Sequence, residues 1–144
     1  MYRRRRRQGF TLIEVLLVLV ILVILGSFAV FQVRGAQRKA LLNAAKSQIG
    51  QFTTPLEMYQ LDVGQYPSTS AGLDALLYPP SELQNPNKWG PEAYINKIPQ
   101  DPWQRPYQYT YPGKMNTESY DIWSFGPDGQ DGTEDDIGNW DDQY

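Results

Sequence analysis

An unbroken apolar run most constrains what this chain of 144 residues can fold into. The run extends from Phe10 to Val33 and contains a single charged residue, Glu14. As an α-helix it would measure roughly 36 Å, which is enough to cross the hydrocarbon core of a bilayer. A helix also satisfies its own backbone hydrogen bonds in lipid. The sequence therefore predicts a transmembrane helix over residues 10–33.

The charges that flank the run predict its orientation. Five arginines, residues 3–7, place the N-terminal end in the cytoplasm, and Arg34, Arg38 and Lys39 oppose this only weakly. A cleaved secretory signal peptide is one alternative, but its apolar region usually has roughly 7–15 residues before a small-residue cleavage site. A simple signal anchor is a second alternative, which hydropathy alone leaves open.

Composition excludes several classes of function. The chain has no His and no Cys, which excludes Cys and His metal sites, cysteine nucleophiles, histidine triads and disulfides. The one basic run adjoins the apolar segment and the remainder is acidic, so no nucleic acid is expected as a partner. An enzyme on a signal anchor is a further alternative, but no nucleophile–base pair is evident. We therefore expect no catalytic residues.

Glu14 is the exception inside the apolar run. An acid in a membrane helix is costly unless it is paired, and no basic residue lies at helical spacing from it. Glu14 could simply lie at headgroup level, since it is near the helix start. A cut just before Phe10 would create an α-amine that could pair with Glu14 of the same chain or of a neighbouring chain.

The residues around Phe10 carry a family resemblance. Residues 8–15, QGFTLIEV, resemble the leader junction of type IV pilins and pseudopilins. The resemblance implies that a prepilin peptidase cuts between Gly9 and Phe10 and that Phe10 becomes N-methylated. It also implies that Glu14 acts in assembly through a neighbour's N-terminus. Residues 1–9 are then a cleaved basic leader, and the apolar helix is retained.

An amphipathic helix is predicted over residues 34–62, as a continuation of the apolar helix. Its apolar residues recur at steps of three and four: Ala36, Ala40, Leu41, Ala44, Ala45, Ile49, Phe52, Leu56 and Tyr59. Pro55 has no backbone N–H to donate to the carbonyl of Gln51, so we expect a kink or break there.

Residues 63–144 predict an α+β domain. A short helix over 71–77 would be capped by Thr69 or Ser70. Residues 107–111 and 119–125 alternate with period two, which predicts an antiparallel hairpin packed on the long helix. The dense Tyr and Trp residues favour core packing, although a sugar-binding surface is an alternative. The predicted fold class is thus α+β, with a long N-terminal helix packed on a small antiparallel β-sheet.

An acidic loop over residues 125–136 is the candidate metal site. Its carboxylates cluster among glycines at positions 126, 129 and 132, which let the backbone turn tightly. Such a loop supplies the hard oxygens that Ca²⁺ prefers. It is not an EF-hand, because Asn139 stands where a bidentate Glu would be expected. A solvated acidic turn is the alternative reading of the composition.

A second resemblance covers nearly the whole chain, to the major pseudopilins of type II secretion systems. The matching blocks are Tyr66–Pro67, Gly72–Leu76, Ile98–Trp103, Pro106–Tyr109, Pro112–Gly113, Tyr120–Gly129 and Asp135–Trp140. The resemblance implies a Ca²⁺ ion held by the carbonyls of Phe125 and Gln130 and by Asp128, Thr133, Asp135 and Asp136. Asp131 and Glu134 then lie outside the ligand set.

The same resemblance implies the function. Such a subunit sits in the inner membrane with its N-terminus in the cytoplasm and its C-terminal domain in the periplasm. It leaves membrane lipid to polymerise with copies of itself into a periplasmic pseudopilus, which drives export of folded proteins across the outer membrane. Minor pseudopilins, the prepilin peptidase and the inner-membrane secretion platform are the other expected partners.

Three residues depart from the family pattern. Phe31 stands where a proline is usual, Gln104 stands where a glycine usually follows Trp103, and Pro55 replaces a small residue in the helix. Three alternatives stay open: a type IV pilin, a minor pseudopilin, and a membrane-anchored, calcium-dependent glycan-binding module. The absence of Cys argues against many type IV pilins, since these often carry a C-terminal disulfide.

Overall fold

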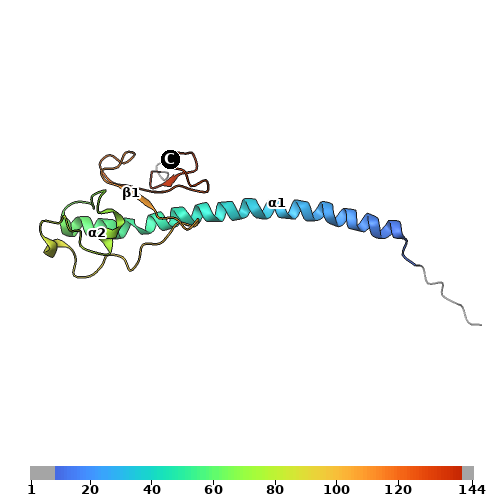
Figure 1. Cartoon of the computed structure of the whole chain (residues 1–144), viewed down its shortest axis with the longest axis horizontal. Coiled ribbons are helices and arrows are strands. Elements are labelled where there is room, and N and C mark those ends of the chain that lie inside the picture. The colour runs from blue at the N-terminus through green and yellow to red at the C-terminus, as the bar shows by residue number, and fades with distance from the viewer. Residues whose placement is uncertain (1–8, 141–144) are drawn as a thin grey trace, which may run out of the picture. The chain divides into compact units, whose positions relative to one another are not determined.

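The computed structural model describes residues 9–140, except for the side chains of residues 28–34. The chain divides into two compact units, with the boundary between Lys39 and Ala40. The predicted leader lies outside the described residues apart from Gly9. Seven elements follow one another within the described residues, and Figure 1 labels α1, α2 and β1.

The first helix, α1, runs from Leu12 to Gln51 (Figure 1). In its first half the large apolar side chains are open to solvent, with exposed fractions that range from 46% at Val18 to 86% at Leu12. Within the described residues, no helix combines the length and the apolar character needed to cross a membrane.

The helix breaks at Phe52, and α2 then runs from Thr53 to Val63. Pro55 lies in the first turn of α2, where a missing backbone N–H costs no intrahelical hydrogen bond. Gly64 ends α2 in the left-handed region with φ +98°, and its N–H donates to the carbonyl of Gln60 at 2.8 Å. The break expected near Pro55 is confirmed.

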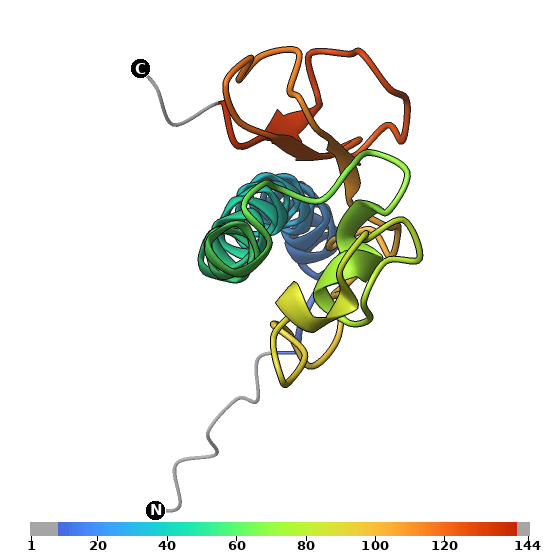
Figure 2. The same cartoon turned by 90° about the vertical axis from the view of Figure 1, so that its left-hand side faces the viewer.

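Three short strands form an antiparallel sheet in the order β1–β2–β3: Gln108–Thr110, Asp121–Ser124 and Ile137–Gly138. Tyr109 pairs with Ile122, and Ser124 pairs with Ile137. In Figure 2 the strands, in orange and red, lie in one layer beside the green helix α2. The expected hairpin is confirmed, whereas β3 was not predicted, because two residues carry no periodicity.

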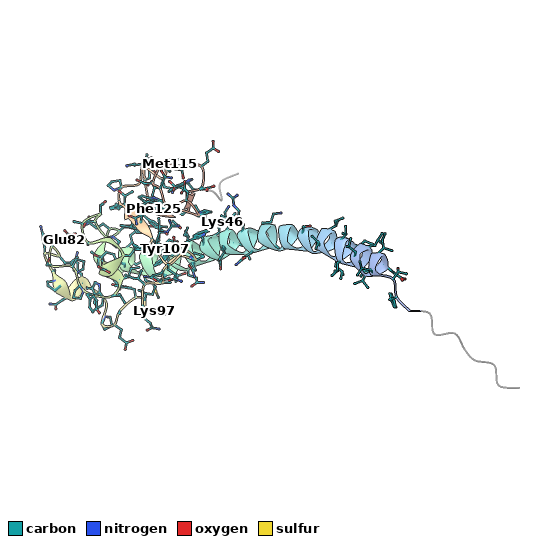
Figure 3. The ribbon with its side chains drawn as sticks, turned by 45° about the vertical axis from the view of Figure 1, so that its right-hand side comes forward. Lys46, Glu82, Lys97, Tyr107, Met115 and Phe125 are labelled. Carbon is teal, nitrogen blue, oxygen red and sulfur yellow. The ribbon has the colours of Figure 1, made fainter. Side chains whose placement is uncertain are left out.

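One hydrophobic core joins the sheet to the helices of the second unit. It is formed by Ala45, Ile49, Phe52, Leu56, Tyr59, Leu73, Ala75, Leu76, Tyr107, Tyr120, Ile122 and Ile137. The ring of Phe52 contacts that of Tyr107 edge-on at 5.6 Å. The hydroxyl of Tyr107, a residue that Figure 3 labels, also donates to Gln48 Oε1 of α1 at 2.5 Å. The apolar stripe predicted for the helix is therefore buried from Ala45 onward, but Ala36, Ala40 and Ala44 are exposed.

The segment between α2 and the sheet contains two 3₁₀ helices, η1 (Gly72–Leu76) and η2 (Pro86–Lys88). The cap expected from Thr69 or Ser70 is wrong. The Ser68 hydroxyl accepts the Ala71 N–H at 3.1 Å instead. Thr69 Oγ1 accepts the N–H of Tyr111 at 3.0 Å, because the fold brings the end of β1 beside it.

Candidate functional site

The N-terminal candidate site lies at the start of α1. Gly9 and Phe10 precede the first helical residue, and Phe10 is 79% exposed. The peptide bond between them therefore lies outside the helix. Glu14 lies in the first turn, where a negative charge is favoured by the helix dipole.

Thr11 caps the start of this helix, although the sequence interpretation gave it no role. Its Oγ1 accepts the backbone N–H of Glu14 at 3.3 Å, as the N-cap residue of a helix does. The spacing Thr-x-x-Glu is a known signature of a helix start and could have identified Thr11. The first turn is thus fixed by Thr11, and the Glu14 carboxylate is exposed.

The acidic loop over residues 125–136 connects β2 to β3. Both ends are fixed by the sheet, since Ser124 and Ile137 are paired across it. Gly126 has φ +63°, and a Cβ there would overlap the carbonyl oxygen of Asp135. The two arms of the loop therefore approach so closely that only glycine fits at position 126.

The predicted ligands of this loop make mostly local hydrogen bonds. Asp128 Oδ1 accepts the Gln130 N–H at 3.0 Å, and Asp136 Oδ2 accepts the Gly132 N–H at 2.7 Å. Thr133 Oγ1 donates to the carbonyl of Gln130 at 3.5 Å. The fold thus brings Thr133 to Gln130. Over residues 9–140, however, no group of three or more acidic side chains is arranged to hold one metal ion.

Asp136 is the loop residue with a buried side-chain oxygen that receives no hydrogen bond within the described residues. Its Oδ1 atom is buried and, within the described part of the chain, has no hydrogen-bond partner. A buried carboxylate oxygen without a donor is costly, and a cation would satisfy it. By contrast, Asp131 Oδ1 accepts the indole N–H of Trp123 at 3.1 Å. Asp131, which was expected outside the ligand set, therefore has another partner.

Arg105 also reaches the acidic loop, and sequence reasoning gave it no role. Its Nη2 donates to the carbonyl of Gly126, and its Nη1 lies against Gly129, where a Cβ would overlap it. Arg105 belongs to a proline-rich stretch without periodicity, so no local pattern indicated this contact.

Asp101 holds the turn that carries Arg105. Its Oδ1 accepts the N–H groups of Trp103 at 3.0 Å and Arg105 at 2.8 Å. Its Oδ2 accepts the hydroxyl of Ser124 at 2.6 Å, which connects the turn to the end of β2. Within this turn Gln104 adopts φ +66°, a left-handed conformation that glycine would adopt without strain.

Asp121 organises the loop between β1 and β2. The carboxylate is 2% exposed and accepts three backbone N–H groups, from Lys114 at 2.6 Å, Met115 at 2.8 Å and Asn116 at 2.9 Å. The Asn116 side-chain amide donates to it as well, at 3.0 Å. Asp121 is therefore a structural acid whose buried charge is compensated locally.

Several tyrosines have raised pKa values, and burial is the main cause. Burial raises the pKa of Tyr94 to about 12, to which its hydrogen bond to Asp62 Oδ2 at 2.9 Å contributes. Burial likewise raises the pKa values of Tyr107 and Tyr109. These hydroxyls bond Asp62, Gln48 and the Pro67 carbonyl, so they pin the core and its surrounding loops.

Comparison with known proteins gives a consistent match along the chain. Residues 32–140 match the family described as "Type II secretion system (T2SS), protein G", and residues 4–30 match the "Prokaryotic N-terminal methylation motif". The type II secretion system core protein G of Aeromonas hydrophila is 46% identical over 138 residues, covering 96% of this chain and 95% of that protein. The core protein G of Pseudomonas aeruginosa is 44% identical over 142 residues, covering 96% and 99%.

The fold matches a solved structure as well. The crystal structure of the major pseudopilin from the type 2 secretion system of enterohaemorrhagic Escherichia coli superposes with a TM-score of 0.67 at 41% sequence identity. The match covers 75% of this chain and 93% of that one.

Proposed function

Since this chain belongs to the protein G family of type II secretion systems, the major pseudopilins, we propose that it polymerises into a periplasmic filament that drives folded proteins across the outer membrane. The family is structural, and the chain is not an enzyme. The proposal extends the family assignment to an assembly, a membrane topology and a cofactor.

The observation that carries the assembly proposal is the uncovered apolar surface of α1. Its large apolar side chains up to Leu25 are about half exposed or more, which no helix sustains in water. Inner-membrane lipid covers residues 10–33 before assembly, and neighbouring copies cover them in the filament. Such a filament is a heterologous assembly, in which one face of a subunit meets a different face of the next.

Processing precedes assembly in this proposal. The prepilin peptidase removes residues 1–9 between Gly9 and Phe10, and Phe10 is N-methylated. The start of α1 at Leu12 supports this, because it leaves the junction outside the helix. Mass spectrometry of the chain from peptidase-positive cells should find methylated Phe10 at the N-terminus. A mature chain that still begins at Met1 would contradict the leader assignment.

Glu14 pairs with the Phe10 amine of a neighbouring subunit and so sets the register of the filament. Its exposed carboxylate at the helix start supports this role. A Glu14→Ala variant should insert in the membrane but form no filaments that electron microscopy can detect. Thr11→Ala is the matched control, because it removes only the cap on the Glu14 N–H and should still assemble. Normal filaments from Glu14→Ala would refute the pairing.

Ca²⁺ is the proposed cofactor of the acidic loop. The residues present suit a hard cation: two carbonyls, from Phe125 and Gln130, and the side chains of Asp128, Thr133, Asp135 and Asp136. The buried Asp136 Oδ1, which has no donor among the described residues, supports a cation at this place. The ion would supply positive charge that holds the arms of the loop together without a disulfide.

A chelator titration tests the cofactor. The full chain in detergent should unfold at a lower temperature in EGTA than in calcium, and added calcium should restore the transition. Magnesium is the control, because it prefers a rigid octahedral site and dehydrates reluctantly, so it should restore the transition poorly. An unfolding temperature that does not depend on EGTA or calcium would remove Ca²⁺ from the proposal.

The remaining partners follow from the topology. The N-terminus of the chain lies in the cytoplasm and its C-terminal domain in the periplasm, as the arginines at residues 3–7 favour. The inner-membrane secretion platform feeds subunits into the filament, and minor pseudopilins associate with it. Crosslinking in cells that carry the complete secretion system should capture these partners, and a chain found only in the cytoplasmic fraction would contradict the topology.

A further inference from the structure

Arg105 makes a cationic contact with the acidic loop from outside that loop. It lies in the turn after Asp101, and 28% of its side chain is exposed. The contact joins residues that are 21 positions apart in the sequence. A positive group is thus brought to the most acidic part of the chain by the fold itself.

The guanidinium is held from three directions. Its Nη2 donates to the carbonyl of Gly126, and its Nη1 occupies the space that a Cβ on Gly129 would need. Its buried Nε faces the Asp101 carboxylate, with Nε 3.8 Å from Oδ2. Asp101 also accepts the backbone N–H of Arg105, so one carboxylate fixes both the backbone and the charge of this residue.

We infer that Arg105 is a positioning residue, a built-in cation that holds the first half of the acidic loop closed. It acts on Gly126 to Gly129, the arm that leaves β2. The second arm contains Asp136, whose Oδ1 is buried and receives no hydrogen bond within the described residues. We therefore assign the first arm of the loop to the Arg105 guanidinium and the second arm to the proposed calcium ion. The assignment of the second arm rests on the function proposed above.

The geometry requires an arginine. A guanidinium is a planar fork, so it can donate to the Gly126 carbonyl while another edge faces Asp101. A lysine ammonium is a single charged point on a flexible stem and cannot make both contacts in this geometry. Arg105→Lys should therefore lower the unfolding temperature less than Arg105→Gln does, but it should not match the wild-type chain.

Two glycines provide a matched test of this contact. Gly129 and Gly132 both have left-handed φ values, +72° and +79°, so alanine strains the backbone at either position. Only at Gly129 would the added Cβ meet Arg105, because a Cβ at Gly132 has nothing within 4 Å. Gly129→Ala should lower the unfolding temperature of the full chain in detergent by roughly 5 °C more than Gly132→Ala does. In the Arg105→Gln background this excess should vanish. Equal losses at the two glycines in both backgrounds would overturn the inference.

A calcium comparison then tests whether Arg105 acts as a cation. Arg105→Gln should lower the unfolding temperature by roughly 5 °C in EGTA and by less than half of that in calcium, because calcium supports the same loop. Lys97→Gln removes one exposed charge of the same unit and should cost nothing in either buffer. Equal losses from Arg105→Gln in both buffers would reduce Arg105 to an ordinary contact and overturn its role as a cation. If the unfolding temperature of the wild-type chain is the same in EGTA and in calcium, the calcium proposal is wrong. The comparison of Gly129→Ala with Gly132→Ala then still tests the role of Arg105.

Discussion

The two loops that flank β2 are both organised around carboxylates, but they satisfy these charges differently. In the loop before β2, the buried Asp121 receives three backbone N–H groups and one side-chain amide. In the loop after β2, one oxygen of Asp136 is buried without a donor in the described structure. The first loop is therefore complete within its own chain, whereas the second has an electrostatic requirement that its own backbone does not meet.

The reason for the difference lies in the direction of the backbone amides. Residues 114–116 turn successive N–H groups toward a single point, which makes a cradle for one carboxylate. The acidic loop instead turns its amides toward separate carboxylates, such as Gln130 toward Asp128 and Gly132 toward Asp136. One acid that receives several donors is stabilised by its own loop, whereas acids that receive one backbone donor each, such as Asp128 and Asp136, depend more on partners from elsewhere.

The largest predicted effect comes from removing the Asp121 carboxylate, which receives four hydrogen bonds in the loop before β2. Asp121→Ala removes the buried carboxylate that accepts three backbone N–H groups and should lower the free energy of unfolding by about 3 kcal/mol or more. Urea denaturation of the full chain in detergent measures this. Asp131→Ala is the control, because that carboxylate is exposed and accepts a single N–H, so its loss should cost less than about 0.5 kcal/mol. Equal losses for the two variants would erase the distinction between the loops.

A smaller effect, whose sign depends on calcium, is predicted for Asp136. Asp136→Asn should cost about 1–2 kcal/mol in calcium, because a ligand charge is lost. In EGTA the same change should be neutral or stabilising, because it removes a negative charge with one buried oxygen, Oδ1, that receives no hydrogen bond within the described residues. The measurement is thermal unfolding in both buffers. Asp131→Asn makes the same charge change outside the proposed ligand set and should change the unfolding temperature equally in the two buffers. If Asp136→Asn also changes the unfolding temperature equally in calcium and in EGTA, the acidic loop needs no ion.

A third change concerns the turn held by Asp101, a second carboxylate whose two oxygens both accept hydrogen bonds. The backbone of this turn is strained at Gln104, which has φ +66°. Gln104→Gly should raise the free energy of unfolding by about 0.5–1 kcal/mol, since relief of the strain exceeds the added entropy of the unfolded chain. Gln104→Ala keeps a Cβ and should change little. Destabilisation by Gln104→Gly would mean that the Gln104 side chain contributes to the turn.

The smallest predicted effect concerns Asp62, whose carboxylate receives a tyrosine hydroxyl in place of backbone amides. The pKa of Tyr94 is raised to about 12, above its ordinary value of 10.0, so the neutral phenol is favoured in the folded chain. The neutral Tyr94 phenol therefore contributes to the free energy of unfolding in full below pH 10, and this contribution is lost as the pH rises toward 12. Tyr94→Phe should flatten the fall of the unfolding temperature in this range, as a melting series at stepped pH would measure. Tyr78→Phe is the control, since the Tyr78 side chain is 69% exposed, and an unchanged pH profile for Tyr94→Phe would contradict the assignment.

Much of the fold could be predicted because its signals are local. The long apolar and amphipathic helix, its break near Pro55 and the hairpin of alternating residues are each encoded within a few turns or strands of sequence. The core stripe from Ala45 to Tyr59 followed from helical spacing alone. The family could be recognised from the leader junction and the blocks around Trp103 and Trp123. The cleavage site, the pairing of Glu14 and the calcium ligands remain predictions.

Only the tertiary structure decided which charges meet. Arg105 reaches Gly126 because Asp101 bonds both the Arg105 backbone and Ser124, and no periodic pattern reports a contact between segments so far apart. The same holds for β3, which is too short to show alternation and exists because Ile137 pairs with Ser124. The sequence by itself determined the elements and the composition of the acidic loop. Packing decided that Asp121 is satisfied and Asp136 is not, because the number of donors around a carboxylate depends on which backbone amides the fold turns toward it.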